Sequence, residues 1–413
     1  MDANSLKLWD LNVPRPQGQS ISGANSRAPM ASSTTTQNAI LIETPTKQAN
    51  ESIDYSPSSN KGRDGSTSST HNPWVKKYIL TLGTSTGGLI AIMLSRLRMN
   101  IDDCIQEYEN LGKEVFAHPR IFSIRGPIPF KRGKFDHRKL EKVIKDVVER
   151  RRLEGDQIAE TMYPSNPDRC RTIVFAIREK NFANAPYLFR TYEHRESACN
   201  YVEQLNPGPA QPVKIWEVAR ATTAAPTYFK PFQLGNERFV DGGFGVFCNN
   251  PTSRAFAEIE QIHGKGTVAL TLSIGTGRPT QLQPIEKHKS TLCSHVAHLI
   301  RYMADAATNA ENTHEYVQKL LEAQGCPYER FNVEGGLGDV DLGEWRMQRG
   351  ENVTLKKINE QTDNYLNQPD VRRRMERVAK MLVDNRLERA KTSRWKVVFT
   401  DTGNTVPNGV MTG

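Results

Sequence analysis

The chain has 413 residues, of which 37% are apolar and 24% are charged, and its net charge is +9. This length is enough for one large hydrophobic core or two ordinary ones. The longest uninterrupted apolar run covers residues 89–94, which is far too short to cross a bilayer, and we expect no signal peptide because the first residues lack its basic and apolar segments. The six cysteines are scattered without the spacing of a zinc site, so we expect reduced thiols, an intracellular and cytoplasmic protein, and neither a metal nor a cofactor.

Residues 1–73 differ in composition from the rest of the chain. They are dominated by Ser, Thr, Asn, Gln, Pro and Gly, and such a segment cannot offset its chain entropy by burial, so we expect a disordered or weakly ordered polar tail. Acidic and basic residues balance in this tail, so the whole net charge belongs to residues 74–413. A basic folded part suits anionic partners such as phospholipid headgroups at a membrane surface. Aromatic and basic residues do not alternate, so we expect no nucleic acid as a partner, and the sequence leaves the oligomeric state unknown.

Strands alternate with helices from residue 74 onward. Strands are predicted over residues 74–82, 170–179, 187–194, 238–241 and 267–277, and helices over residues 89–98, 101–117, 137–152, 215–226 and 251–264, with further largely helical stretches over 291–325 and 352–392. This alternation predicts an α/β fold with a mostly parallel sheet and helices on both faces. We take residues 74–390 as one domain with extra C-terminal helices packed on it, and residues 391–413 as a C-terminal tail.

A glycine-rich turn connects the first of these strands to the first helix. It contains Gly83-Thr84-Ser85-Thr86-Gly87, which fits the pattern G-x-S-x-G. In this pattern the serine lies on a tight, strained turn that lifts its hydroxyl clear of the sheet, and the glycines let neighbouring backbones approach. The helix that follows directs free N–H groups to the same place, which favours developing negative charge. Ser85 is therefore the candidate nucleophile, with Gly83 and Gly87 as motif glycines; a turn with an incidental serine is the alternative.

A serine hydroxyl is a weak nucleophile until a base removes its proton. Asp241 is the candidate base, because it ends a short apolar strand and precedes Gly242 and Gly243, and catalytic groups of open α/β sheets collect at the carboxyl edge. It could act on the serine directly, as a dyad, or orient a histidine in a triad. The histidines available for a triad are His263, His288, His295, His298 and His314. None of them lies in a loop just beyond a predicted strand, but the residues alone leave both arrangements open.

Four blocks, in this order, resemble the patatin-like phospholipase family: GTSTGGLIAIML, ARATTAAPTYF, FVDGGFGVFCNNP and LSIGTG. They cover most of residues 80–280, and residues 94–116 extend the similarity. The resemblance implies a three-layer α/β/α sandwich and non-specific hydrolysis of lipid acyl esters by a catalytic dyad of Ser85 and Asp241. It implies that Asp241 takes the serine proton, that an acyl-enzyme forms, and that water then releases the fatty acid without any metal. It also implies that residues 273–277 form a structural turn rather than a nucleotide-binding loop.

One part of the family pattern is absent from this sequence. Patatin-like enzymes carry a glycine-rich loop, D-G-G-G-x-[RK]-G, after their first strand, and its backbone amides form the oxyanion hole. Residues 37–48 could supply a strand at about the right distance, but no glycine-rich run follows them, and residues 61–67 lie too near Ser85 and follow no strand. The oxyanion hole is therefore unknown, and the loss of one donor typically slows such a reaction by about 10²–10³. Three interpretations remain: an active lipid acyl hydrolase, a catalytically weak patatin-like protein that binds lipid or a protein partner, or an ester hydrolase with a histidine triad.

Overall fold

A computed structural model gives the fold of the chain. It describes residues 39–46, 76–117, 133–151, 161–165, 170–179, 186–194, 205–226, 228–244, 248–264, 267–278, 310–334, 336–337, 340 and 342–390. The expected C-terminal tail, residues 391–413, lies outside the described residues, as does all of the expected N-terminal tail except residues 39–46. Within the described ranges, every helix falls short of the length and apolar character that crossing a membrane requires.

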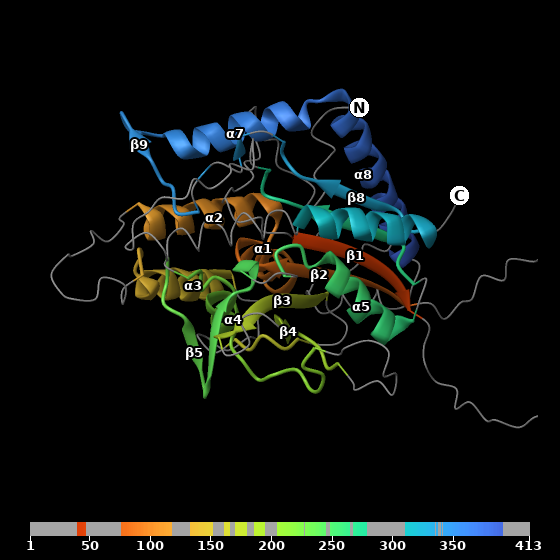
Figure 1. Cartoon of the computed structure of the whole chain (residues 1–413), viewed down its shortest axis with the longest axis horizontal. Coiled ribbons are helices and arrows are strands. Elements are labelled where there is room, and N and C mark those ends of the chain that lie inside the picture. Colours follow the sequence, from red (N-terminus) through yellow and green to blue (C-terminus); the bar gives the residue numbers. More distant parts are fainter. Residues whose placement is uncertain are drawn as a thin grey trace, which may run out of the picture.

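Within the described residues, an eight-stranded sheet forms the centre of the fold (Figure 1). Seven of its strands follow the order β5-β6-β3-β2-β1-β7-β8, and the eighth, β4, pairs with β3. The strands are β1 (Ala39–Thr46), β2 (Lys76–Thr84), β3 (Arg171–Arg178), β4 (Pro186–Arg190), β5 (Phe232–Leu234), β6 (Glu237–Asp241), β7 (Leu270–Ile274) and β8 (Tyr328–Phe331). A separate hairpin consists of β9 (Met347–Gln348) and β10 (Glu351–Asn352).

The sheet is mixed, so the prediction of a mostly parallel sheet is not confirmed. Among the described strands, parallel pairing is limited to β2 with β3 and β7 with β8. The pairs β3–β4, β3–β6 and β5–β6 are antiparallel. A two-residue connection at Gly235 joins β5 to β6, and only antiparallel strands can be joined by such a tight hairpin. The alternation of predicted strands and helices in the sequence does not show where two strands are connected without a helix and therefore pair antiparallel.

Strand β1 was predicted to belong to the polar tail, but it lies inside the sheet. It pairs with β2 and with β7, and it runs antiparallel to both (Figure 1, red). The boundary expected at residue 73 therefore does not separate residues 39–46 from the folded part. The sequence contains a reason for this: the run Ala39-Ile40-Leu41-Ile42 is one of the few apolar stretches in residues 1–73.

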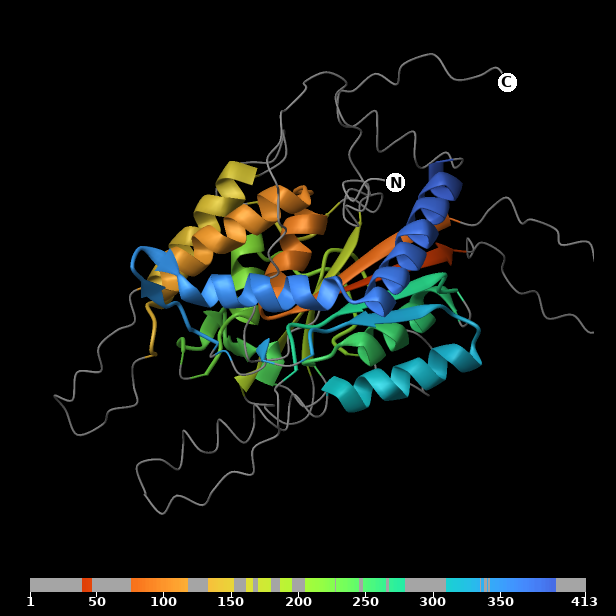
Figure 2. The same cartoon turned by 90° about the horizontal axis from the view of Figure 1, so that it is seen from above.

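Helices cover both faces of the sheet. They are α1 (Thr86–Ala91), continued by a π-helical turn over Ile92–Arg96, α2 (Ile101–Phe116), α3 (His137–Arg151), α4 (Ile215–Thr222), α5 (Thr252–His263), α7 (Val353–Leu366), α8 (Pro369–Ala390) and a helix over residues 310–323. In Figure 2, α2 and α3 (orange and yellow) lie on one side of the strands, and α5 (green) and the 310–323 helix (cyan) lie on the other.

Alternating side chains of β3 contact these two helical layers. Val174 and Ala176 pack in one hydrophobic cluster with α1 to α4, whereas Ile173 and Phe175 pack in another cluster with α5. Such two-sided burial is why this strand reads as a continuous apolar run. At the other end of the sheet, β7 and β8 pack against α7 and α8. The result is an arrangement of helices, sheet and helices, with Ser85 between β2 and α1.

Candidate active site

Ser85 lies on a tight turn between β2 and α1. Its backbone has φ 56° and ψ −123°, a region that residues with a side chain rarely adopt. The turn folds back so closely that a Cβ atom on Gly83 would lie 2.0 Å from the carbonyl oxygen of Gly87. Gly83 is therefore required by sterics, as G-x-S-x-G predicts. Gly88, which lies outside the G-x-S-x-G pattern, is also tightly packed, because a Cβ there would lie 3.0 Å from the Thr222 side chain.

Asp241 reaches the same place from the end of β6. Strand β3 extends three residues beyond its last partner in β2, and β6 pairs with this extension, so that Asp241 lies opposite Ala176. The Asp241 N–H donates to the carbonyl of Ala224, 3.1 Å away, just after α4. Gly242 is the next residue, and a Cβ on it would lie 2.6 Å from the Phe175 carbonyl oxygen. This close approach explains the first glycine after the aspartate.

The Ser85 hydroxyl donates a hydrogen bond to Oδ2 of Asp241, although the two residues are 156 positions apart in the chain. The second carboxylate oxygen, Oδ1, accepts a hydrogen bond from the Gly243 N–H at 2.7 Å. Both side chains are almost fully buried, with exposed fractions of 2% for Ser85 and 1% for Asp241. The structure thus brings the two candidate residues into direct contact, with one oxygen of Asp241 fixed and the other on the serine.

Burial decides the protonation of Asp241. Removal from water penalises the charged carboxylate and raises the pKa of Asp241 from 3.8 to about 7, although the hydrogen bonds from Ser85 and Gly243 act in the opposite direction. A carboxyl group with such a pKa can accept a proton near neutral pH and release it again in a later step.

The described histidines of the triad alternative lie away from this contact. The ring Nε2 of His263 lies 3.0 Å from the Arg171 guanidinium, at the start of β3 and therefore at the edge opposite Ser85. Burial and the nearby Arg171 lower the pKa of His263 to about 4. His314 contacts the hydroxyl of Tyr328, at the start of β8. His288, His295 and His298 lie outside the described residues.

The expected structural turn at residues 273–277 is held by the segment after β8. The Gly277 N–H donates to Oδ1 of Asn332 at 2.7 Å, and the Gly275 N–H donates to the Phe331 carbonyl at 2.8 Å. A Cβ on Gly275 would lie 2.4 Å from the same Asn332 oxygen. The backbone amides of these two glycines are therefore engaged within the protein, as they would be in a structural turn.

The direction of β1 bears on the oxyanion hole. Ala39 pairs with Gly83, next to the nucleophile turn, whereas Thr46 pairs with Lys76 at the opposite end of β2. The strand therefore ends at the edge away from Ser85. A loop that directly followed β1 would begin at that far edge. The end of β1 therefore does not place a loop next to Ser85, where the family's glycine-rich loop forms the oxyanion hole.

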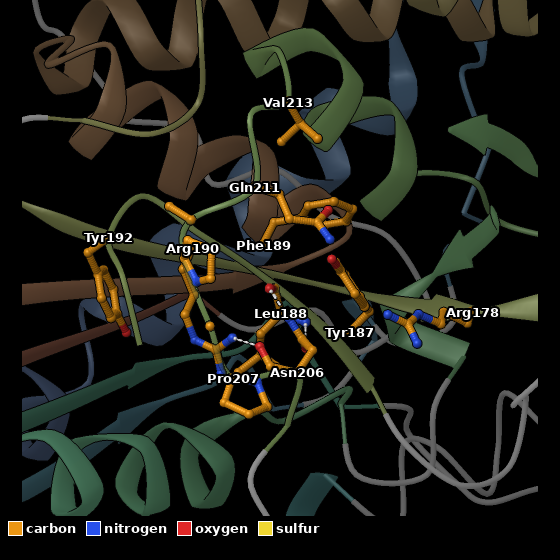
Figure 3. Close-up of a pocket in the computed structure, with 13 residues that line it drawn as sticks. Arg178, Tyr187, Leu188, Phe189, Arg190, Tyr192, Asn206, Pro207, Gln211 and Val213 are labelled. Carbon is orange, nitrogen blue, oxygen red and sulfur yellow. Dashed lines mark hydrogen bonds between the residues drawn. The ribbon is translucent and has the colours of Figure 1, made fainter. Parts of the chain in front are cut away.

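A pocket of about 180 Å³ lies along β4, and neither Ser85 nor Asp241 lines it (Figure 3). Its floor includes Arg190, whose guanidinium makes two hydrogen bonds to the carboxylate of Glu258, at 2.6 and 2.9 Å. Asn206 closes the strand edge by pairing its amide with both backbone groups of Leu188, at 2.9 and 3.0 Å. Because the charges in this pocket are already paired, we regard the β4 pocket as structural.

The four sequence blocks lie mostly within a range that matches a known protein family. The family model of the patatin-like phospholipases matches residues 76–256, a range that begins at β2 and includes both Ser85 and Asp241. Residues 76–256 belong to the patatin-like phospholipase family. The resemblance seen in the sequence is thereby confirmed, and strand β1 precedes the matched range.

The similarity to known relatives extends beyond the family match. Calcium-independent phospholipase A2-gamma of Rattus norvegicus is 26% identical over 334 residues, which are 80% of this chain but 39% of the rat protein. The 85/88 kDa calcium-independent phospholipase A2 of Mus musculus is 30% identical over 48% of this chain and 23% of the mouse protein. Phospholipase A I of Arabidopsis thaliana is 24% identical over 50% of this chain and 18% of the plant protein. The chain thus spans about two fifths, or less, of the length of these relatives.

Proposed function

We propose that this chain is a lipid acyl hydrolase that cleaves fatty-acyl esters of phospholipids through Ser85 and Asp241. The relatives are named phospholipases, and the family match covers both residues. The observation that carries the proposal is the hydrogen bond from the Ser85 hydroxyl to the buried Asp241 carboxylate. It joins a nucleophile to a base without an intervening group.

In the proposed reaction, Asp241 accepts the hydroxyl proton while Oγ of Ser85 attacks the ester carbonyl. The tetrahedral intermediate collapses to an acyl-enzyme, and the departing alcohol takes the proton back from Asp241. A water molecule then gives its proton to the same carboxylate and attacks the acyl-enzyme, which releases the fatty acid and restores the serine hydroxyl. A pKa of about 7 suits both roles of Asp241, because the group must gain and lose a proton at similar pH.

The second candidate function is a catalytically weak patatin-like protein that binds lipid or a protein partner. The motivation is the missing glycine-rich loop, together with the direction of β1, which ends at the edge away from Ser85. A hydrolase of this type needs hydrogen-bond donors directed at the developing oxyanion, and each one contributes about 10²–10³ in rate. A protein without them would keep the fold and the contact between Ser85 and Asp241 but turn over slowly.

A pair of assays separates these candidates. Hydrolysis of a short p-nitrophenyl ester and of phospholipid vesicles is compared for the wild type, Ser85→Ala and Asp241→Asn, and a fluorophosphonate probe reports whether the serine is activated. The proposal expects turnover and labelling in the wild type, and neither above background in Ser85→Ala. Wild-type turnover no higher than that of Ser85→Ala would favour the binding protein. His263→Ala and His314→Ala are expected to retain full activity, and a large loss in either would favour a histidine triad.

We also propose that the hydrolase unit extends beyond the matched range to about residue 390. The sheet includes β7 and β8, and the apolar side chains of these two strands pack against α7 and α8. Peripheral contact of this basic unit with anionic membranes is a related proposal, based on the net charge of +9. Binding to vesicles that contain phosphatidylserine should weaken as salt rises to physiological levels, and binding that is independent of salt would contradict it.

A further inference from the structure

The backbone N–H of Ser85 is bound by a side chain from another element. It donates to Oγ1 of Thr222, 2.8 Å away, at the C-terminal end of α4. The hydroxyl of Thr222 in turn donates to the carbonyl oxygen of Phe175 in β3, at 2.7 Å. Thr222 is fully buried, so no water competes for these bonds. One hydroxyl thus connects the nucleophile turn, α4 and β3.

The two hydrogen bonds fix the direction in which the hydroxyl of Thr222 points. A hydroxyl has one proton to donate and lone pairs that accept. Since the proton is given to Phe175, a lone pair faces the Ser85 N–H. Serine is the natural replacement that keeps both bonds, whereas valine has the same shape and keeps neither.

The turn has a reason to need such support. Ser85 has φ 56°, and a residue held in this region persists only where the surroundings fix it. Rotation of the peptide group before Ser85 would move its side chain away from Asp241. The Thr222 side chain also lies close to Gly88 in the first turn of α1, where a Cβ would be 3.0 Å from both Oγ1 and Cγ2. Thr222 therefore lies against two residues of the turn, Ser85 and Gly88.

We propose that Thr222 is a positioning residue that holds the backbone of Ser85 so that its hydroxyl stays on Asp241. The inference rests on the proposed function, in which Ser85 is the nucleophile. The same bond engages the Ser85 N–H, so an oxyanion formed during the reaction takes its hydrogen bonds from other donors. A purely structural role, in which Thr222 only joins α4 to β3, predicts a loss of stability without a specific loss of turnover.

Thr223 provides a matched control for this proposal. It is the next residue, it is also buried, and its hydroxyl donates to the Ala219 carbonyl at 2.8 Å within its own helical turn. Thr223→Val therefore removes the same hydroxyl group from the same region without touching the Ser85 N–H.

The experiment compares Thr222→Val, Thr222→Ser, Thr222→Cys and Thr223→Val in the full chain. With a p-nitrophenyl ester, Thr222→Val is expected to lower kcat by about 10- to 100-fold with KM within about threefold of wild type, since a small misplacement of a reacting group costs about this much. Thr222→Ser should restore kcat to within about threefold, and Thr223→Val should leave kcat unchanged. In the pH–rate profile of Thr222→Val, the midpoint of the fall in kcat on the acid side should stay near pH 7, because Thr222 does not contact Asp241. A Thr222→Val protein with wild-type kcat would overturn the proposal.

Two further measurements keep the proposal open to refutation. Thr222→Cys replaces the hydroxyl by a thiol, which is a weaker hydrogen-bonding group, and it serves as the test if Thr222→Val does not fold. It should lower kcat at least about fivefold, and wild-type kcat in Thr222→Cys would overturn the proposal. Hydrogen exchange of the Ser85 amide, followed by mass spectrometry, does not depend on activity. Faster exchange in Thr222→Cys than in the wild type is expected, and equal exchange would contradict the positioning role. A wild type without turnover or labelling but with this exchange difference would refute the proposed function alone.

Discussion

Replacement of Asp241 by asparagine is expected to abolish hydrolysis and, at alkaline pH, to make the protein more stable. The substitution keeps the size of the side chain but removes its charge. In the folded protein the carboxyl group is buried and bound by Ser85 and Gly243. Its ionised form is therefore penalised relative to the unfolded chain, and asparagine does not carry this penalty.

The pKa gives the size and the sign of the effect. Burial raises the pKa of Asp241 from 3.8 to about 7. Below pH 3.8 both states hold the proton and the group contributes no pH dependence. Between pH 3.8 and 7 the unfolded chain releases the proton first, so the wild type loses about 1.4 kcal/mol of stability per pH unit from this group. Above pH 7 the loss is complete, at about 4 kcal/mol as an upper bound.

Urea unfolding of the wild type and Asp241→Asn, followed by tryptophan fluorescence at pH 5, 6, 7 and 8, measures this difference. The stability of the variant relative to the wild type should rise by up to about 3 kcal/mol between pH 5 and pH 7 and then stay level. Any change in hydrogen bonding adds an offset that does not vary with pH. Asp384→Asn, which removes an exposed carboxylate from α8, serves as the control. A difference between wild type and Asp241→Asn that is constant from pH 5 to 8 would refute the reasoning.

Three other predictions follow from the site and its surroundings. The kcat of ester hydrolysis should fall about tenfold per pH unit below pH 7, as Asp241 becomes protonated, and a pH–rate profile that is flat down to pH 5 would contradict this. Gly83→Ala should abolish fluorophosphonate labelling and lower the urea midpoint, because the new Cβ would lie 2.0 Å from the Gly87 carbonyl oxygen; normal labelling would be inconsistent with the turn described. Glu258→Gln should lower the free energy of unfolding by about 3–5 kcal/mol, since it leaves the buried Arg190 without its counter-charge. Activity of the folded fraction should stay within about twofold, and a specific loss of kcat would mean that the β4 pocket communicates with the site.

The sequence predicts the local parts of this molecule better than the connections between them. The turn around Ser85 is predictable because glycine spacing, a β-branched strand and an apolar helix are all encoded within a few residues. The proximity of Asp241 follows from the ends of two strands. The role of Thr222 in contacting Ser85 was not visible, because the two residues are 137 positions apart and a hydroxyl at a helix end has no distinctive pattern.

The direction of the strands was also beyond the sequence. Hydrophobic periodicity shows which residues face a core, but it is the same for a strand that runs in either direction. Strand β1 was assigned to a polar tail because the composition of residues 1–73 as a whole outweighed one short apolar run. Strands β5 and β8 were missed because they have three and four residues, too few for a period to appear.

Strand β1 has a consequence for how the folded unit is delimited. Among the described strands, it alone connects the half of the sheet that carries Ser85 and Asp241 to the half formed by β7 and β8. The family match begins at residue 76, so a fragment that began there and kept the residues up to 390 would lack the strand that joins the two halves. Such a fragment would present the free edges of β2 and β7 to other molecules, and exposed edges of this kind pair with one another. Any shortened version intended for purification should therefore begin before Ala39 rather than at the start of the recognisable domain.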